Sequence, residues 1–209
     1  MKSRPIIMTT EMVNALLKGR KTKTRRDRGL NKINQNPDNY TFKHLFDIDY
    51  VWYACFANSE GEIIEEIRCP YGIEGDKLWV KEAFMFDNEA EPNIPIYKGG
   101  LDAKTIEEFT KYGLKWKSPL FMPYCYRRFE LDITDIRVER LQDITEEEAE
   151  AEGVFYTTSN LEYQPIETTA IEAYKALFDK INGAGQWDKN PWVWVIDFVD
   201  ATRSIILPN

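Results

Sequence analysis

The chain has 209 residues, of which 43% are hydrophobic and 30% charged, and its formal net charge is −8. This composition excludes a disordered protein and fits one folded domain with a hydrophobic core, or a small domain enlarged by insertions. The acidity excludes a broad, nonspecific coating of nucleic acid, because such binding needs many basic contacts to phosphate.

The sequence contains no membrane or export signal. Its longest apolar run is far shorter than the roughly 20 residues of a membrane-spanning helix. The N-terminal segment MKSRPIIMTTEM lacks a secretory apolar region and a cleavage pattern. We therefore predict a cytoplasmic protein with no membrane partner.

The cysteines do not indicate a disulfide framework or a metal site. Cys55, Cys69 and Cys125 are widely spaced, and His44 is the single histidine. Structural zinc sites usually take their ligands in close pairs such as C-x-x-C, and the chain has no such pair. We expect neither a metal nor another cofactor.

Positive charge is concentrated near the N-terminus. Residues 1–28 hold nine Lys and Arg and two Asp and Glu, a balance of +7, whereas the rest of the chain has a balance of −15. Seven of the eleven residues in 18–28 are basic. Such a strip is either a solvated edge or a surface that faces something negative, such as a few phosphates.

The first predicted elements flank this basic strip. Apolar residues at helical spacing predict a helix over 10–18, with Thr9 or Thr10 as its N-cap and Gly19 just after its end. The segment KTKTRR that follows alternates and predicts an extended strand. In such a strand Lys21, Lys23 and Arg25 share one face, and Thr22, Thr24 and Arg26 share the other.

The middle of the chain contains two predicted insertions. Residues 27–50 are polar and predict a long loop, and a hairpin with strands at 50–57 and 62–69 follows it. An apolar strand is predicted over 77–84. From 87 to 122 the periodicity disappears apart from a helical segment near 103–112, so this part is also interpreted as an insertion.

The next two predicted elements are a strand and a short helix. Residues 127–141 alternate, which predicts one long strand or two strands joined at Asp135. Thr145 followed by Glu148 fits a capping box, in which each side chain accepts a hydrogen bond from the other residue's backbone N–H. This helix is expected to end at Gly153.

An amphipathic helix over 168–182 and a buried strand over 191–199 complete the predicted fold. Trp192 and Trp194 in that strand are expected to be core residues. Five or six strands that do not alternate regularly with three helices indicate an α+β fold with a small barrel.

Four motifs occur in an order that resembles one family. They are LLKGRKTKTRR (16–26), GDKLWVKE (75–82), LQDITEEEAEAEGV (141–154) and WVWVIDF (192–198). The chain resembles the ASCH domain of the PUA-like superfamily, in particular the larger versions found in phages and prophages. The stretches 27–68 and 86–122 have no counterpart in the minimal ASCH domain. We therefore predict a single domain over 1–209 that carries these two insertions.

This resemblance implies a fold and a function. The implied fold is a small mixed or antiparallel PUA-like β-barrel with flanking helices and a cleft for RNA or a nucleoside. Some small bacterial ASCH proteins are amidohydrolases that remove the acetyl group of N4-acetylcytidine, and RNA binding is attributed to other members. The amidohydrolases use a Lys and a Thr of a G-x-K-x-x-T segment and a Glu at a helix end. The matching residues in this sequence are Lys21, Thr24 and Glu152.

Amide hydrolysis needs a nucleophile, a base and an acid. Thr24 offers a hydroxyl, and Lys21 can act as a base only if its pKa falls well below about 10.4. Basic neighbours favour such a fall and a carboxylate partner opposes it, so the sequence leaves the direction open. The helix end and nearby glutamates are expected to raise the pKa of Glu152. The alternative is that Glu152 is one acid on a solvated helix face.

The predicted nucleotide-binding residues are Arg20, Lys23, Arg26, Tyr126 and Arg128. Arg suits phosphate because of its planar fork, and Lys adds a point charge. Tyr126 and Arg128 belong to PYCYRRF (123–129), a mixture of aromatic and basic residues that suits unpaired bases. The alternatives are an exposed basic edge strand and a strand that enters a barrel.

Three functions remain open from the sequence. The first is an ASCH protein that binds RNA or a modified nucleoside in a basic cleft and hydrolyses an N-acyl amide such as that of N4-acetylcytidine. The second is a noncatalytic RNA-binding module. The third is a phage accessory or assembly protein that contacts a protein partner through its insertions.

Overall fold

The structure is a computed structural model that describes residues 1–86, 94–154 and 169–202. The strands in this part are β1 (Ser3–Ile7), β2 (Lys23–Arg26), β3 (Thr41–Asp47), β4 (Trp52–Ala57), β5 (Ile63–Arg68), β6 (Lys77–Lys81), β7 (Phe84–Phe86), β8 (Pro95–Tyr97), β9 (Glu130–Arg140) and β10 (Trp192–Asp200). The α-helices are α1 (Thr10–Leu17), α2 (Ala103–Lys111), α3 (Glu146–Ala151) and α4 (Ala170–Asn182). The α+β class is therefore confirmed, with more strands than the sequence predicts.

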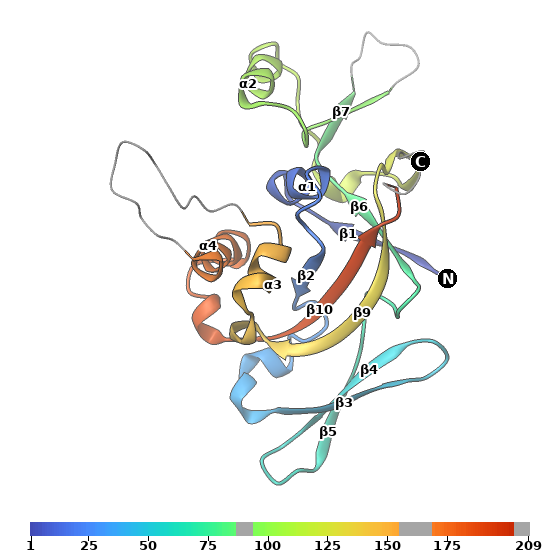
Figure 1. Cartoon of the computed structure of the whole chain (residues 1–209), viewed down its shortest axis with the longest axis vertical. Helices are drawn as coiled ribbons and strands as arrows, with labels where there is room; N and C mark the ends of the chain where they lie inside the picture. Colours follow the sequence, from blue (N-terminus) through green and yellow to red (C-terminus); the bar gives the residue numbers. More distant parts are fainter. Residues whose placement is uncertain (87–93, 155–168, 203–209) are drawn as a thin grey trace.

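A five-stranded sheet forms the centre of the molecule, in the order β1-β6-β9-β10-β2. β1 and β6 are parallel, and the other neighbouring pairs are antiparallel. The long strands β9 and β10 curve together (Figure 1), and their register shifts between Asp197 and Phe198. Among the described residues β1 and β2 are the two open edges of this sheet, so a closed small barrel stays a prediction.

Strand β10 is buried on both of its faces. Trp194 and Ile196 belong to the main core, which also includes α1, β6 and β9. Val193 and Val195 belong to a second core formed with α4. Successive strand residues point to opposite faces, so a strand between two cores needs an almost continuous apolar run, and this explains the segment WVWVIDFV.

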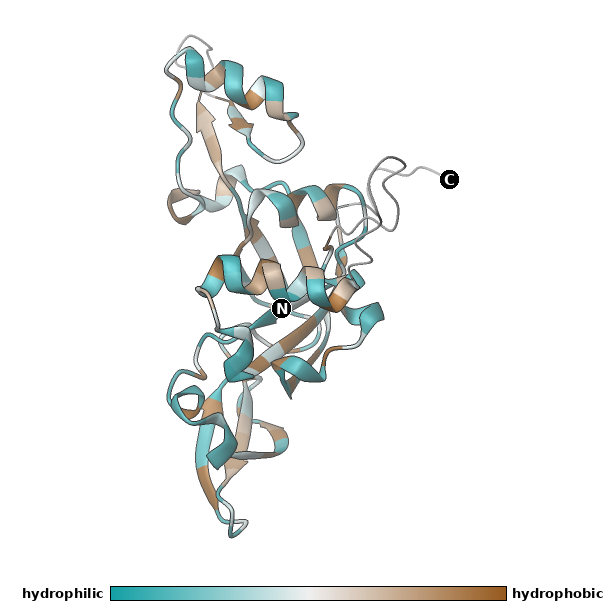
Figure 2. Cartoon of the chain, turned by 90° about the vertical axis from the view of Figure 1, so that its left-hand side faces the viewer, coloured by the Kyte–Doolittle hydropathy of each residue, from teal (hydrophilic) through white to brown (hydrophobic). Residues whose placement is uncertain are grey.

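The helices begin where their capping residues predict. The Thr9 hydroxyl accepts a hydrogen bond from Met12 N at 3.3 Å before α1. Thr169 and Glu172 form a complete capping box before α4, and residue 168, the predicted first residue of that helix, lies outside the described residues. Hydrophilic and hydrophobic residues are mixed along the helices in Figure 2, as expected for helices that bury only one face.

Only half of the capping box predicted for α3 forms. Thr145 Oγ1 accepts from Glu148 N at 3.3 Å, as expected. The Glu148 carboxylate instead binds the guanidinium groups of Arg25 and Arg137. These charge-assisted hydrogen bonds are stronger than a bond to the Thr145 backbone N–H, so the tertiary contact prevails.

The loop predicted over 27–50 is wrong in its second half, because β3 lies there. β3 pairs with β4, and β4 pairs with β5, so the predicted hairpin is part of a three-stranded sheet. A register shift between Phe42 and His44 interrupts the alternation of β3. This bulge removes the two-residue period by which a strand is recognised in a sequence.

The second predicted insertion forms a separate unit. The hairpin β7–β8 and helix α2 lie at the end of the molecule opposite the three-stranded sheet (Figure 1). The strand predicted over 77–84 is divided between β6 and β7, and residues 87–93 of the insertion lie outside the described part. None of the helices in the described part is long and apolar enough to cross a membrane.

The three-stranded sheet is joined to the main core by an aromatic contact. The Phe56 ring is fully buried, and its centroid lies 5.3 Å from that of Trp192. We expect Phe56→Ala to lower the free energy of unfolding by about 3–5 kcal/mol in urea denaturation, because it leaves a cavity. The exposed Ile64→Ala on the same sheet is the control. An equally small effect of both changes would contradict this packing.

Candidate functional site

Lys21 and Glu152 lie in direct contact. Lys21 Nζ is 2.8 Å from Glu152 Oε2, and the exposed fractions of the two side chains are 0% and 1%. Nζ also donates to the backbone oxygens of Lys23 at 2.7 Å and Glu152 at 2.9 Å. The ammonium group thus has three acceptors inside the protein. The two residues meet as a packed ion pair, not across a hollow.

Gly153 allows these two segments to approach each other. It ends α3 with φ +84°, and a Cβ at this position would lie 2.5 Å from Ala15 Cβ and 3.0 Å from Lys21 Cβ. Thr22 N donates to Ala151 O at 2.8 Å beside it. Any side chain at position 153 would therefore push the end of α3 away from the turn that carries Lys21.

Burial decides the protonation behaviour of Lys21. Removal from water lowers the pKa of its ammonium group, and the Glu152 carboxylate only partly opposes this effect. The nearby cations Arg26 and Arg25 lower the pKa further. The direction that the sequence left open is therefore downward. Burial, and secondarily the Glu152 charge, raise the pKa of the Tyr174 hydroxyl on α4.

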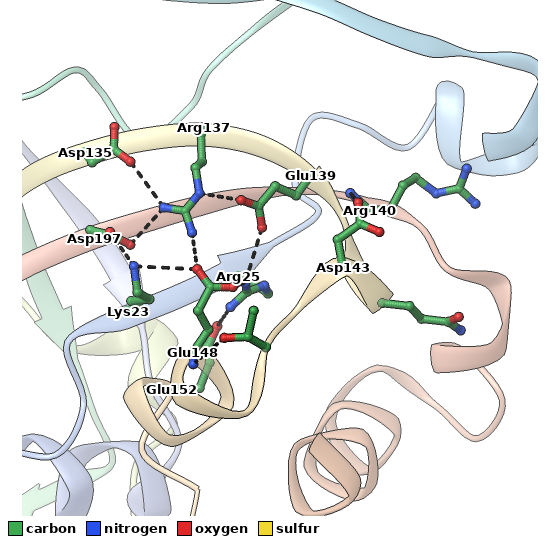
Figure 3. Close-up of polar contacts among 12 residues, drawn as sticks. Lys23, Arg25, Asp135, Arg137, Glu139, Arg140, Asp143, Glu148, Glu152 and Asp197 are labelled. Carbon is green, nitrogen blue, oxygen red and sulfur yellow. Dashed lines mark hydrogen bonds and ion pairs between the residues drawn. The ribbon is translucent and has the colours of Figure 1, made fainter. Parts of the chain in front are cut away.

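A network of charged residues continues from this pair along the sheet (Figure 3). Arg25 has a fully buried side chain that pairs with Glu148 and lies 3.7 Å from Glu152 Oε1. Lys23 Nζ is 2.5 Å from Asp197 and 3.7 Å from Glu148. The predicted common face of Lys21, Lys23 and Arg25 is therefore present, and it is neutralised by carboxylates of α3, β9 and β10.

Thr24 points to the other face of β2. It pairs with Ile196, whose side chain belongs to the main core, whereas Arg25 pairs with Val195 of the second core. The Thr24 hydroxyl is buried and has no hydrogen-bond partner among the described residues. The structure therefore joins Lys21 to Glu152 but provides no hydrogen bond between Thr24 and either residue.

A pocket of about 380 Å³ lies beside the ion pair, between α1, the end of α3 and α4. Its apolar lining consists of Met12, Val154, Ala173 and Leu177. Its polar lining consists of Glu11, Asn14, Lys18, Arg20 and Glu152, and Gly153 completes it. Of the ion pair, only Glu152 lines the pocket. We call this space the α1–α4 pocket.

The sequence identified some of this lining and missed the rest. Arg20 was predicted, and its Nη1 donates to Val154 O at 3.3 Å across the pocket. Asn14 and Lys18 were not predicted as site residues. They are four residues apart and share a face of the α1 segment, a spacing that could have identified them.

The other predicted nucleotide-binding residues lie elsewhere. Arg26 donates from Nη2 to Ile7 O at 3.0 Å and lines a second pocket. Tyr126 packs on Phe86 at the base of the β7–β8 hairpin, with ring centroids 5.3 Å apart. Arg128 makes two hydrogen bonds, of 2.8 and 2.7 Å, to the buried Glu82. The fold does not gather the five predicted residues into one cleft.

Comparison of the chain with protein-family models, with curated proteins and with solved structures found no match.

We expect the two members of the buried ion pair to be strongly coupled in stability. Lys21→Met and Glu152→Gln should each lower the free energy of unfolding by about 3–5 kcal/mol, because each leaves a buried polar group without its partner. The double variant should lose clearly less than the sum of the two. Urea denaturation of all three variants measures this coupling.

The exposed pair Lys111–Glu107, at 2.9 Å on α2, is the matched control, and Lys111→Met should change stability little. Additive losses for Lys21 and Glu152 would contradict the coupling.

Proposed function

We propose that this protein binds a modified nucleoside, a nucleotide or an unpaired nucleotide of RNA in the α1–α4 pocket. The observation that carries this proposal is the mixed lining of the pocket, in which apolar side chains are combined with two cations, two carboxylates and an amide. Its volume of about 380 Å³ falls in the range of about 300–1,000 Å³ that is typical of small-molecule sites.

The apolar and the polar lining residues suit different parts of a nucleotide. Met12, Val154 and Leu177 offer apolar contact to the face of a base. Lys18 offers a cation to a phosphate group. Asn14 Oδ1 accepts from Gly100 N at 2.7 Å, which orients the side chain and leaves its NH2 group as a donor to a base edge.

The ASCH resemblance supports the same pocket. Two of its motifs, residues 16–26 and 141–154, supply Lys18, Arg20, Glu152, Gly153 and Val154 to the lining. On this proposal the curved five-stranded sheet corresponds to the PUA-like barrel, and 27–68 and 86–122 are its insertions. The basic strip and α3 are far apart in the chain, yet both motifs contribute residues to one pocket. Their proximity supports a shared binding site, as the resemblance implies.

A catalytic version of this function is favoured by the position of Glu152. Its carboxylate would accept a proton from a water molecule as the water oxygen attacks the acyl carbon of an N-acylated base. The same proton then passes to the amine nitrogen as the C–N bond breaks, which releases acetate and the free base amine. Lys21 would act as a positioning residue, since it contacts Glu152 and does not line the pocket.

A noncatalytic binder is the second candidate. The observation in its favour is the burial of both side chains, with exposed fractions of 0% and 1%. An ion pair that is so deeply buried is well suited to a structural role in which it joins the end of α3 to the segment before β2. Binding without release of acetate distinguishes this candidate from the hydrolase.

We expect Ala173→Phe to abolish binding to the α1–α4 pocket, because the larger ring fills it beside Leu177. Isothermal titration with cytidine 5′-monophosphate and N4-acetylcytidine measures this loss. Lys18→Gln should weaken the nucleotide about tenfold, since it removes a charged contact to phosphate, and should affect the nucleoside less. Lys43→Gln on β3 is the control. Wild-type affinity in Ala173→Phe would contradict the proposed site.

In the catalytic version, we expect hydrolysis of N4-acetylcytidine to become faster as pH rises from 6 to 10. Because its pKa is lowered, Lys21 loses its proton at a pH below the ordinary lysine pKa of about 10.4. Loss of this positive charge makes the neighbouring Glu152 carboxylate a stronger base. Glu152→Gln should abolish acetate release, and Lys21→Met should flatten the pH profile. Absence of acetate release by the wild type at every pH would contradict catalysis and would favour the noncatalytic binder.

A further inference from the structure

The basic strip is divided between two environments. On one face of β2, Lys21, Lys23 and Arg25 are each paired with a carboxylate. Arg26 and Arg28 instead line a second pocket, of about 260 Å³, together with Lys81 of β6. None of these three cations forms an ion pair with a carboxylate in residues 1–86, 94–154 or 169–202. We call this space the β1–β6 pocket.

The remaining lining of the β1–β6 pocket contains no acid. It consists of Pro5, Ile6, Ile7, Tyr71 and Leu120. Tyr71 is 5% exposed. Burial raises the pKa of its hydroxyl well above the ordinary value, so the group stays protonated and able to donate a hydrogen bond.

Backbone contacts hold two of the cations in place without neutralising them. Arg26 Nη2 donates to Ile7 O at 3.0 Å, and Lys81 Nζ donates to Leu120 O at 2.5 Å. Lys81 Nζ also lies 5.5 Å from the centre of the Trp79 ring. Carbonyl and ring contacts orient a cation but leave its full charge. Three such charges around one concave pocket repel each other, and a bound anion offsets this repulsion.

We propose that the β1–β6 pocket binds a backbone phosphate of single-stranded RNA. Two guanidinium groups and one ammonium group match the several oxygens of a phosphate, which accept forked and single hydrogen bonds. The overall charge of −8 opposes any wider attraction of nucleic acid. The contact is therefore confined to the few phosphates that reach this pocket.

The exposed residues next to the pocket favour a single strand over a free phosphate or a duplex. Leu120 lines the pocket and is 60% exposed, and Phe121, the next residue in the chain, is 72% exposed. An exposed aromatic ring stacks on an unpaired base, and such stacking adds affinity independently of sequence. The bases of a duplex have their faces covered by their neighbours, and a free phosphate has no base.

This inference concerns a site separate from the α1–α4 pocket. It shares with the proposed function only the class of ligand, and either site can fail while the other holds. Arg28, Lys81 and Tyr71 were not among the residues that the sequence assigned to nucleotide binding.

The test measures binding of a fluorescent 12-nucleotide single-stranded RNA at several salt concentrations by anisotropy. Each phosphate that the protein neutralises on a single strand contributes about −0.7 to the slope of log K against log salt, so one phosphate in this pocket predicts a slope of about −0.7. Arg28→Gln/Lys81→Gln should weaken binding about tenfold or more and bring the slope toward zero. Phe121→Ala should weaken binding about tenfold with an unchanged slope.

The matched control is Lys43→Gln/Lys104→Gln, which removes two exposed cations outside the pocket and should leave affinity and slope unchanged. Ala173→Phe, which fills the other pocket, measures the part of the RNA affinity that belongs to that pocket. Circular dichroism and urea denaturation verify that each variant is folded.

Three outcomes overturn the proposal. The first is wild-type affinity and slope in Arg28→Gln/Lys81→Gln. The second is loss of RNA binding in Ala173→Phe alone, which assigns the RNA to the α1–α4 pocket. The third is a preference for another ligand. Equal affinity for a duplex of the same sequence shows that no single strand is selected, and binding of inorganic phosphate without binding of RNA identifies a free phosphate as the ligand.

Discussion

The buried ion pair between Lys21 and Glu152 is the interaction on which the arrangement of α1, β2 and α3 depends. Removing two charges from water costs several kcal/mol for each ion, and the pair offsets this through its own contact and through two backbone oxygens that accept from Lys21 Nζ. The contact also needs Gly153, because a side chain there would collide with Ala15 and Lys21. The α1–α4 pocket lies against this joint, so its shape depends on the same residues.

The two faces of β2 show how an acidic protein keeps a basic segment. On one face, acids from α3, β9 and β10 neutralise Lys23 and Arg25, and Arg137 links three of these carboxylates with Asp135 (Figure 3). On the other face, Arg26 is held by a backbone carbonyl and keeps its charge. The net positive charge available to a ligand is therefore much smaller than the sequence indicates, and Arg26 and Arg28 hold part of it at the β1–β6 pocket.

Both proposed sites are formed where segments distant in the chain meet. The α1–α4 pocket combines the N-terminal helix with residues that follow α3, and the β1–β6 pocket combines β1, the end of β2 and Leu120 from the second insertion. The first predicted insertion is also part of the core, since its residue Phe56 packs on Trp192 of β10. A nucleotide function and an RNA-backbone contact are compatible on this fold because the two pockets have no lining residue in common.

The sequence by itself determined the features that depend on neighbouring residues: the start of α1 at Thr9 or Thr10, its end before Gly19, the alternation of β2 and the burial of β10. Tertiary structure alone decided features that depend on distant partners. It turned the Glu148 side chain from its predicted cap toward Arg25 and Arg137, gave β3 a partner strand, and directed Thr24 into the main core. It also set the direction of the Lys21 pKa, because a pKa responds to burial and to charges brought close by folding, and neither quantity is encoded in local spacing.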